Sequence, residues 1–282
     1  MITKNKRKFR VQNPFAALSR FERGLWMMSV AVILGCGIVG NIVGTVSGGT
    51  AADGTAGGMD PLSAAASLVG VTALIFVAKG MVTGQVLTVV FAVFYGIISY
   101  RFRYFGEMIT YLCMTAPMAM AAVISWLLHP YTEDGSDVER SDADRSDTDV
   151  HPAAKEVAVS RVGGRAWAGL CLLTALVTVL FYFILRAMGN ASLAVSTVSV
   201  TTSFLASALT FMRSPYYALA YAANDIVLIV LWSIAAASAP AYLSMVFCFL
   251  MFFFNDLYGF YNWKRMERRQ TAADRTESDR IL

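Results

Sequence analysis

Residues 216–237 read YYALAYAANDIVLIVLWSIAAA, so an aspartate stands in the middle of a stretch that is otherwise almost entirely apolar. About 20 apolar residues are enough for a helix to cross a lipid bilayer. The pair Asn224-Asp225 recurs as Asn255-Asp256 in a second apolar stretch at 241–263. A charged side chain costs about 2.5–3.5 kcal/mol at the centre of a membrane helix, so such residues usually face a cavity, a partner or a substrate. The two pairs therefore predict a path for a solute between membrane helices.

The composition of the whole chain indicates an integral membrane protein. Of its 282 residues, 57% are hydrophobic and 15% are charged, and the mean hydropathy is +0.56. Soluble domains, by contrast, are about 45–50% apolar. The apolar runs are continuous rather than alternating, which argues against a β-barrel and predicts an all-α fold class. We expect eight membrane-spanning helices, at 25–47, 61–79, 81–100, 105–128, 166–187, 191–211, 216–237 and 241–263.

Basic residues flank the first and the last predicted helix. Because positively charged flanks tend to stay in the cytoplasm, both termini are predicted to be cytoplasmic, and an even number of spans agrees with this. Lys79 and Arg213 then also lie inside, whereas Arg101 and Arg103 lie outside and are an exception. We therefore expect a multi-pass protein of the cytoplasmic (inner) membrane. The flanking residues are Lys4, Lys6, Arg7, Lys8, Arg10, Arg20 and Arg23 before the first helix, and Lys264, Arg265, Arg268 and Arg269 after the last.

The segment between the fourth and fifth predicted helices differs from the rest of the chain. From Tyr131 to Val150 it carries eight acidic residues with Ser and Thr between them. Such a composition cannot bury enough apolar surface to fold. Residues 129–164 are therefore predicted to form a disordered cytoplasmic linker. A docking site for a partner is an alternative that no residue pattern supports specifically.

Residues that could carry enzyme chemistry are few. The two histidines, His129 and His151, flank the acidic segment, and the four cysteines are scattered singly without a CxxC spacing. The sequence also has no GxxxxGK[ST] loop of the kind that binds nucleotide phosphates. We therefore expect no enzyme activity, no catalytic residues, no metal site and no cofactor, and no nucleic acid as a partner.

An internal repeat organises the apolar helices. Four residues of the first half match four residues of the second half at one constant offset. Three helices at 61–128 thereby match three at 191–263, with the helix at 166–187 as a connector and the helix at 25–47 as an addition. The two triplets run in the same direction, which is the parallel-repeat arrangement of some small transporters. The matched pairs are Tyr95 and Trp232, Phe105 and Tyr242, Met108 and Met245, and Trp126 and Trp263.

The end of the last predicted helix carries the motif of a known family. Residues 255–264 read NDLYGFYNWK, which resembles the closing N-x-x-Y-G-x-x-x-W signature of PnuC-type vitamin transporters, best known for the uptake of nicotinamide riboside. Asn224-Asp225 with Trp232 is similar to the preceding helix of that family, and the stretches 95–100, 104–107 and 117–126 fit its first repeat. The resemblance covers about residues 61–266 without the acidic segment.

This resemblance implies a fold and a function. The expected fold is the SWEET-like 3+1+3 arrangement of two parallel three-helix repeats and a connector, plus the extra N-terminal helix. The expected function is facilitated diffusion of nicotinamide riboside, a precursor of NAD, into the cell, where a cytoplasmic kinase traps it by phosphorylation. A homotrimer would agree with the family. Transport of thiamine or riboflavin on the same fold is one alternative, and a membrane scaffold or channel subunit is another.

The chain accordingly divides into seven predicted parts. They are a basic cytoplasmic tail at 1–24, an extra transmembrane helix at 25–47, a first three-helix repeat at 61–128, an acidic disordered cytoplasmic linker at 129–164, a connector transmembrane helix at 166–187, a second three-helix repeat at 191–263 and a cytoplasmic tail at 264–282.

Two helices of the second repeat each present a face that is both polar and aromatic. Tyr221, Asp225 and Trp232 lie four and seven residues apart, so they share one side of a helix. Aromatic rings can stack on a flat heteroaromatic ring, and amides can satisfy its polar edges and the ribose hydroxyls. The last helix repeats this pattern at spacings of three and four, with Asn255, Tyr258 and Asn262.

The charge of the expected substrate fits the aspartates. Nicotinamide riboside and thiamine carry a fixed positive charge, and a cation over Trp232 or a tyrosine gains about 1–2 kcal/mol when it is desolvated. Asp225 or Asp256 would supply the opposite charge. Alternatively, the two aspartates form hydrogen bonds between helices or pair with Arg213 and Lys264. The predicted substrate-binding residues are Asn224, Asp225, Trp232, Asn255, Asp256, Tyr258, Asn262, Tyr221, Gln85, Tyr95 and Tyr111.

Overall fold

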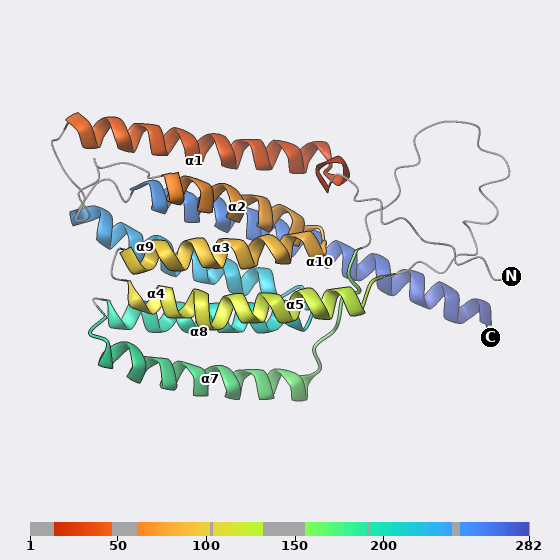
Figure 1. Ribbon diagram of the computed structural model, residues 1–282. Coiled ribbons are helices and arrows are strands. Elements are labelled where there is room, and N and C mark those ends of the chain that lie inside the picture. The colour runs from red at the N-terminus through yellow and green to blue at the C-terminus, as the bar shows by residue number, and fades with distance from the viewer. Residues whose placement is uncertain are drawn as a thin grey trace, which may run out of the picture.

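The protein is a bundle of long helices in this computed structural model, which describes residues 14–46, 61–101, 104–131, 156–190, 192–238 and 243–281 (Figure 1). The helices run side by side, with α1 at one edge of the bundle and α7 at the other. A short 3-10 helix, η1, precedes α1, and a π-helix, η2, lies between α4 and α5. The bounds are η1 Pro14–Ala17, α1 Arg20–Val46, α2 Pro61–Ala78, α3 Val82–Arg101, α4 Phe105–Ile109, η2 Thr110–Thr115, α5 Ala116–Leu128, α7 Gly164–Ala187, α8 Leu193–Phe211, α9 Tyr217–Ser238 and α10 Leu243–Ile281.

Seven helices within the described residues are long and apolar enough to cross a membrane. They correspond to the first seven predicted spans, and α4, η2 and α5 together form one continuous span, Phe105–Leu128. Each is at least 18 residues long, which is close to the length that a bilayer core requires. The prediction of an all-α membrane protein is thereby confirmed.

The eighth predicted span, 241–263, falls on α10, but this helix does not end with the apolar sequence. It continues to Ile281, a length of 39 residues, and it is not among the seven. The residues after Trp263 are polar, yet many of them are good helix formers, and Lys264 donates to Glu267 at 2.6 Å. The change from apolar to polar sequence therefore marks the end of the membrane-like part of α10 and not the end of the helix.

The helices that surround the centre of the bundle come from both halves of the chain. Helix α9 packs against α8 and α10, and α3 packs against α2, α4 and α5. Helix α10 also packs against α2, which joins the two halves. At the edges, α1 contacts α2 and α10, and α7 contacts α8. Apolar side chains of α7, among them Leu172, Leu176 and Phe183, are exposed on the outside of the bundle, as a helix surrounded by lipid requires.

The π-helix η2 coincides with a proline. Pro117 occupies the first turn of α5, and a proline inside a helical span cannot donate the usual backbone hydrogen bond. A π-turn of Thr110–Thr115 directly precedes it. Single π-turns within α-helices are often found at functional sites. Here the turn changes the direction of the side chains of Tyr111 and Thr115 relative to a regular helix.

Two turns at the same end of the bundle have the same backbone conformation. Gly80, after α2, has a φ of 68°, and Arg213, after α8, has a φ of 59°. The latter is unusual, because a left-handed backbone is normally adopted by glycine. In both turns, the left-handed residue and the residue after it donate N–H groups back to the preceding helix. These bonds are Gly80 to Val77 (2.8 Å), Met81 to Phe76 (3.0 Å), Arg213 to Thr210 (3.0 Å) and Ser214 to Leu209 (2.9 Å).

Two of the four residue pairs that match in the sequence repeat meet in space. Trp232 donates its indole N–H to the hydroxyl of Tyr95 at 3.0 Å. The rings of Trp126 and Trp263 lie 5.4 Å apart. Each of these two tryptophans also donates to a backbone carbonyl in the other half of the chain, Trp126 to Thr210 (3.1 Å) and Trp263 to Val77 (2.8 Å).

Most of the predicted linker lies outside the described residues, as do the first 13 residues of the basic tail. The two described ends of the linker, at 129–131 and 156–163, form an antiparallel bridge between Pro130 and Val157. This bridge lies where α10 projects beyond the bundle (Figure 1). We call this the extension end of the bundle, and the other the opposite end.

Candidate functional site

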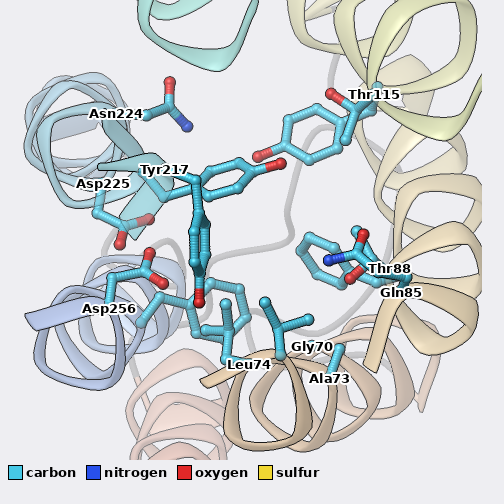
Figure 2. A pocket seen from close by; sticks show the side chains of 15 residues that line it. Gly70, Ala73, Leu74, Gln85, Thr88, Thr115, Tyr217, Asn224, Asp225 and Asp256 are labelled. Atoms are coloured by element: carbon cyan, nitrogen blue, oxygen red, sulfur yellow. The ribbon is translucent and has the colours of Figure 1, made fainter. Parts of the chain in front are cut away.

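A cavity lies between α2, α3, η2, α9 and α10 (Figure 2). In this structure the cavity has a volume of only ≈ 50 Å³, below the range of about 300–1,000 Å³ that small-molecule sites occupy, so it must widen before it holds a ligand. Both halves of the chain therefore contribute to one site. The lining residues are Gly70, Ala73, Leu74, Val77, Gln85, Thr88, Phe91, Tyr111, Thr115, Tyr217, Tyr221, Asn224, Asp225, Phe252 and Asp256.

Two carboxyl groups form one wall of the cavity. Asp225 on α9 and Asp256 on α10 point toward each other (Figure 2), close enough for a hydrogen bond between their side chains. Each residue is only 4% exposed, and Oδ2 of Asp225 has no partner among the described residues. The ion pairs between described residues include neither aspartate. A positive charge beside these groups would therefore find a carboxyl oxygen with which no described residue pairs.

Asn224 directs the donor end of its amide into the cavity. Its Oδ1 faces α8, where three hydroxyl groups contact it. The amide nitrogen is left on the cavity side (Figure 2). Asn224 can therefore donate to a carbonyl oxygen of a ligand while its own oxygen stays satisfied. The hydroxyl contacts are Ser199 at 3.2 Å, Thr202 at 2.9 Å and Ser203 at 3.0 Å.

A third buried carboxyl group, that of Glu107 on α4, lies behind this wall. Glu107 is fully buried, and its Oε1 has no partner among the described residues. Its Oε2 accepts from Ser199 at 3.3 Å, and Ser199 also contacts Asn224. Glu107 does not line the cavity, but one hydroxyl group connects it to the amide that does.

Aromatic rings enclose the space between the polar walls. Phe91, Tyr111, Tyr217, Tyr221 and Phe252 line the cavity. Gly70 makes room for two of them, because a Cβ atom at this position would come within 2.5 Å of Phe252 and 3.0 Å of Phe91. A slot bounded by aromatic rings suits a flat ligand, and a cationic ring would gain additional stabilisation from their faces.

The wall that faces the aspartates is polar but uncharged. Gln85 and Thr88 of α3 lie across the cavity from Asp225 and Asp256 (Figure 2), and Thr115 of η2 also lines the cavity. An amide and two hydroxyls can both donate and accept hydrogen bonds. This wall can therefore bind hydroxyl groups of a ligand whose charge faces the aspartates.

The cavity is closed at both ends in this structure. Its volume of ≈ 50 Å³ leaves no room for a small molecule. Toward the opposite end, Tyr95 and Trp232 form their hydrogen bond and the rings of Tyr95 and Tyr111 lie 4.4 Å apart. Toward the extension end, the rings of Tyr217 and Trp263 lie 4.9 Å apart. A ligand can enter or leave only when some of these aromatic side chains move.

Six of the eleven predicted site residues line the cavity: Gln85, Tyr111, Tyr221, Asn224, Asp225 and Asp256. Tyr95 and Trp232 instead cap it at the opposite end through their hydrogen bond. Lys264, the alternative partner of the aspartates, pairs with Glu267. The role of all eleven in binding a substrate stays a prediction.

The remaining three predicted residues share a face of α10, as expected, but this face lies against α1 and α2. Asn255 donates to Ser29 Oγ at 3.0 Å, and Tyr258 donates to Glu22 Oε1 at 2.9 Å. Asn262 donates to the carbonyl of Ala78 at 2.8 Å. Successive helical residues point about 100° apart, so Asp256 faces the cavity while its neighbour Asn255 does not.

Five polar or aromatic lining residues were missed by the sequence prediction, although their spacing could have indicated them. Each lies three or four positions from a predicted residue on the same span and therefore on the same face. The pairs are Thr88 with Gln85, Phe91 with Tyr95, Thr115 with Tyr111, Tyr217 with Tyr221, and Phe252 with Asp256.

Comparisons with known proteins agree with the motif found in the sequence. The profile of the nicotinamide mononucleotide transporter family matches residues 60–265. The nicotinamide riboside transporter PnuC of Neisseria mucosa is 22% identical over 212 residues, which cover 75% of this chain and 74% of the relative. The corresponding transporter of Haemophilus influenzae is 25% identical over 200 residues, which cover 71% of this chain and 77% of the relative.

Structural similarity extends over most of the chain. A crystal structure of the vitamin B3 transporter PnuC matches with a TM-score of 0.68 and 20% sequence identity, and the match covers 90% of this chain and 94% of that chain. At this level of identity the similarity concerns the fold. Together with the family profile, it identifies the protein as a membrane transporter. The chain therefore belongs to the PnuC-type nicotinamide mononucleotide transporter family, as the motif at 255–264 predicts.

Proposed function

We propose that the protein carries nicotinamide riboside across the cytoplasmic membrane by facilitated diffusion. Two of its relatives are nicotinamide riboside transporters by name. The observation that carries the proposal is the cavity, whose described lining includes Asp225 and Asp256, five aromatic rings and no basic side chain. Nicotinamide riboside combines a flat pyridinium cation, a carboxamide and ribose hydroxyls, and each of these has a chemical counterpart in the cavity.

The three parts of this substrate fit three parts of the site. The pyridinium ring would lie between the aromatic side chains, with its charge toward Asp225 and Asp256. The carboxamide oxygen would accept from the amide of Asn224, whose own oxygen is occupied by α8. The ribose hydroxyls would face Gln85 and Thr88. Burying a cation without a nearby carboxylate would be very costly in a membrane interior, so the paired aspartates are the central element of this arrangement.

For the architecture, we propose two parallel three-helix repeats in the SWEET-like 3+1+3 arrangement, with α7 as the connector and α1 as an addition. The first repeat comprises α2 to α5, and the second comprises α8 to α10. Support comes from the two turns at Gly80 and Arg213, which share a left-handed conformation and the same hydrogen bonds. Further support comes from the contacts between matched residues, such as Tyr95 with Trp232.

We propose that the extension end faces the cytoplasm, with both termini on that side. Basic residues near this end include Lys79, Arg161, Arg165 and Arg213, together with those of α10 beyond Trp263. This distribution follows the positive-inside bias. A carrier of this kind only equilibrates its substrate, so we further propose that a cytoplasmic kinase phosphorylates the imported riboside and so prevents its return. A homotrimer is the assembly expected from the family.

Thiamine is the second candidate substrate, because its thiazolium ring is also a flat cation that would suit the two aspartates. Riboflavin lacks this fixed charge and therefore fits the acidic wall less well. A channel or scaffold function is disfavoured by a cavity that is closed toward both ends by aromatic side chains.

Calorimetry on the purified protein in detergent tests the proposal. Nicotinamide riboside, thiamine, riboflavin and neutral nicotinamide would each be titrated into the unmodified protein, Asp225→Asn and the control Ser233→Ala. Ser233 lies on the same helix but is exposed on its outer side. We expect nicotinamide riboside to bind most tightly, and Asp225→Asn to weaken its binding about 100-fold, or ~2.7 kcal/mol. If none of the four ligands binds, or if Asp225→Asn binds normally, the proposal is wrong.

A further inference from the structure

A short extended segment crosses the extension end of the bundle and takes no part in the cavity. It comprises Glu156–Arg161, and we call it the strap. Val157 is almost completely buried, and its N–H donates to the carbonyl of Gly80 at 3.1 Å. Three residues later, the N–H of Ser160 donates to the carbonyl of Arg213 at 3.0 Å. The strap is therefore bonded to both of the turns that have the same left-handed conformation.

These two turns occupy corresponding positions in the two halves of the chain. Gly80 joins α2 to α3, and Arg213 joins α8 to α9. The strap binds both turns in the same way, because it donates one backbone hydrogen bond to the carbonyl of the left-handed residue in each turn. Any movement that separates the two turns must therefore break at least one of these bonds.

Both edges of the strap also form hydrogen bonds. On one side, Tyr131 donates to the carbonyl of Glu156 at 2.8 Å, and Ala158 donates to the carbonyl of His129 at 3.0 Å. All four successive N–H groups from Val157 to Ser160 thereby have acceptors. Buried backbone groups need such partners, so the segment is held in one defined position.

On the other side, Gln270 of α10 takes the place of a neighbouring strand. Its Oε1 accepts from the N–H of Val159 at 2.8 Å, and its Nε2 donates to the carbonyl of Val157 at 3.1 Å. Gln270 is itself buried. This side chain can form both bonds only because α10 continues as a helix beyond Trp263. The part of α10 beyond Trp263 therefore holds the strap in place through Gln270.

The strap lies directly over the aromatic closure of the cavity. Val157 belongs to the same cluster of buried apolar residues as Trp126, Tyr217 and Trp263, and Tyr217 also lines the cavity. A Cβ atom on Gly80 would lie 3.3 Å from Val157 Cγ1, which indicates how closely the strap packs on the turn. Ion pairs of Glu156 with Arg269 and of Arg161 with Glu267 lie at its two ends.

We propose that the strap is an internal latch that keeps the extension end of the carrier closed, and that its release from Gln270 and from one of the two turns is a step of the transport cycle. The proposal rests on the proposed function, since it assumes a cavity that opens alternately at each end. A substrate that leaves at the extension end must pass between the two sets of helices. The strap is the backbone connection between them at that point.

Thiol labelling from each side of the membrane tests this latch. The four native cysteines, Cys36, Cys113, Cys171 and Cys248, are replaced by alanine, and Ala73→Cys places a reporter in the cavity wall. A membrane-impermeant maleimide is applied to inside-out or right-side-out vesicles. Gln270→Ala should raise the labelling rate from the extension side about fivefold or more, without raising it from the opposite side. The control Arg268→Gln changes an exposed residue of the same helix and should leave both rates unchanged.

A cross-link provides a second measurement that does not depend on the stability of Gln270→Ala. The pair Val159→Cys and Gln270→Cys joins the strap to α10 under oxidising conditions. Uptake of labelled nicotinamide riboside into proteoliposomes should stop on oxidation and return on reduction, while binding of the riboside in detergent persists. Unchanged labelling in Gln270→Ala, or uptake that continues in the cross-linked protein, would overturn the latch. The labelling does not require a bound vitamin, so a failure of the proposed substrate is recognised separately by the absence of binding.

Discussion

The two ends of the cavity are closed in different ways. At the opposite end, closure depends on side chains, chiefly Trp232, whose N–H bonds to Tyr95 and whose ring lies 5.2 Å from Tyr104. At the extension end, the aromatic rings of Trp126 and Trp263 are covered by a strap that is bonded through its backbone. Rotation of side chains could open the opposite end, whereas opening the extension end requires the backbone hydrogen bonds of the strap to break. We therefore expect the cavity to open more readily at the opposite end.

The largest effects should come from replacing Tyr217 or Tyr111, because each of these tyrosines lines the cavity and also helps to close one of its ends. Tyr217 contacts Trp263 on the extension side, and Tyr111 contacts Tyr95 on the opposite side. Truncation of a buried aromatic side chain to alanine typically costs about 3–5 kcal/mol of stability. Tyr217→Ala and Tyr111→Ala should both weaken binding of nicotinamide riboside about tenfold or more, because each removes a wall of the aromatic slot.

The two variants should nevertheless differ in which end they open. Labelling of the Ala73→Cys reporter should rise from the opposite side in Tyr111→Ala and, by a smaller factor because the strap still covers that end, from the extension side in Tyr217→Ala. Thermal unfolding in detergent would establish that both proteins are folded. The same pattern of labelling in both variants would contradict the assignment of one tyrosine to each end.

A smaller effect is expected at the two turns under the strap. Gly80→Ala adds a Cβ atom at a left-handed position, 3.1 Å from Met266 Cε, and should destabilise the protein by about 1–2 kcal/mol. Arg213→Gly relieves the corresponding strain and keeps the carbonyl that the strap uses, so it should be neutral or stabilising by up to about 1 kcal/mol. Thermal unfolding of the pair measures both effects. Equal destabilisation by both substitutions would contradict the view that the left-handed backbone is unstrained at Gly80 and strained at Arg213.

The tryptophans permit a direct comparison of the two ends. Trp232→Phe removes the N–H that bonds to Tyr95, and Trp263→Phe removes the N–H that bonds to the carbonyl of Val77. Each loss should cost about 1 kcal/mol, since a net hydrogen bond contributes about 0.5–1.5 kcal/mol. Trp232→Phe should increase labelling from the opposite side. Trp263→Phe should not increase labelling from the extension side, because the strap still covers residue 263. An increase from the extension side in Trp263→Phe would indicate that the strap contributes little to closure.

The smallest expected effect concerns α1. Tyr258→Phe removes the bond to Glu22 of α1, which also pairs with Lys79 at 3.0 Å. It should lower stability by about 0.5 kcal/mol and change the affinity for nicotinamide riboside less than about twofold. Calorimetry and thermal unfolding provide both numbers, with Tyr261→Phe, an exposed neighbour, as the control. A clear loss of affinity would instead support a role of Tyr258 in the substrate site.

Hydropathy was sufficient to locate the helices, because the span of a bilayer requires about 20 apolar residues whatever their packing. Predicted and observed bounds therefore agree within a few residues for most spans, as in 105–128 and Phe105–Leu128. The end of α10 could not be read in this way. Beyond Trp263 the residues are mostly polar but still form a helix, and Gln270 on this part of α10 forms two hydrogen bonds with the strap.

The sequence by itself determined that this is an all-α membrane protein, that it belongs to a transporter family and that Asp225 and Asp256 are central polar residues. These conclusions need only hydropathy, spacing and a motif. Tertiary structure alone decided that Asp256 faces the cavity while Asn255 faces α1, and that the strap joins two turns far apart in the chain. The physical reason is that a helix presents every residue to some neighbour, and only the packing of the other helices decides which neighbour that is.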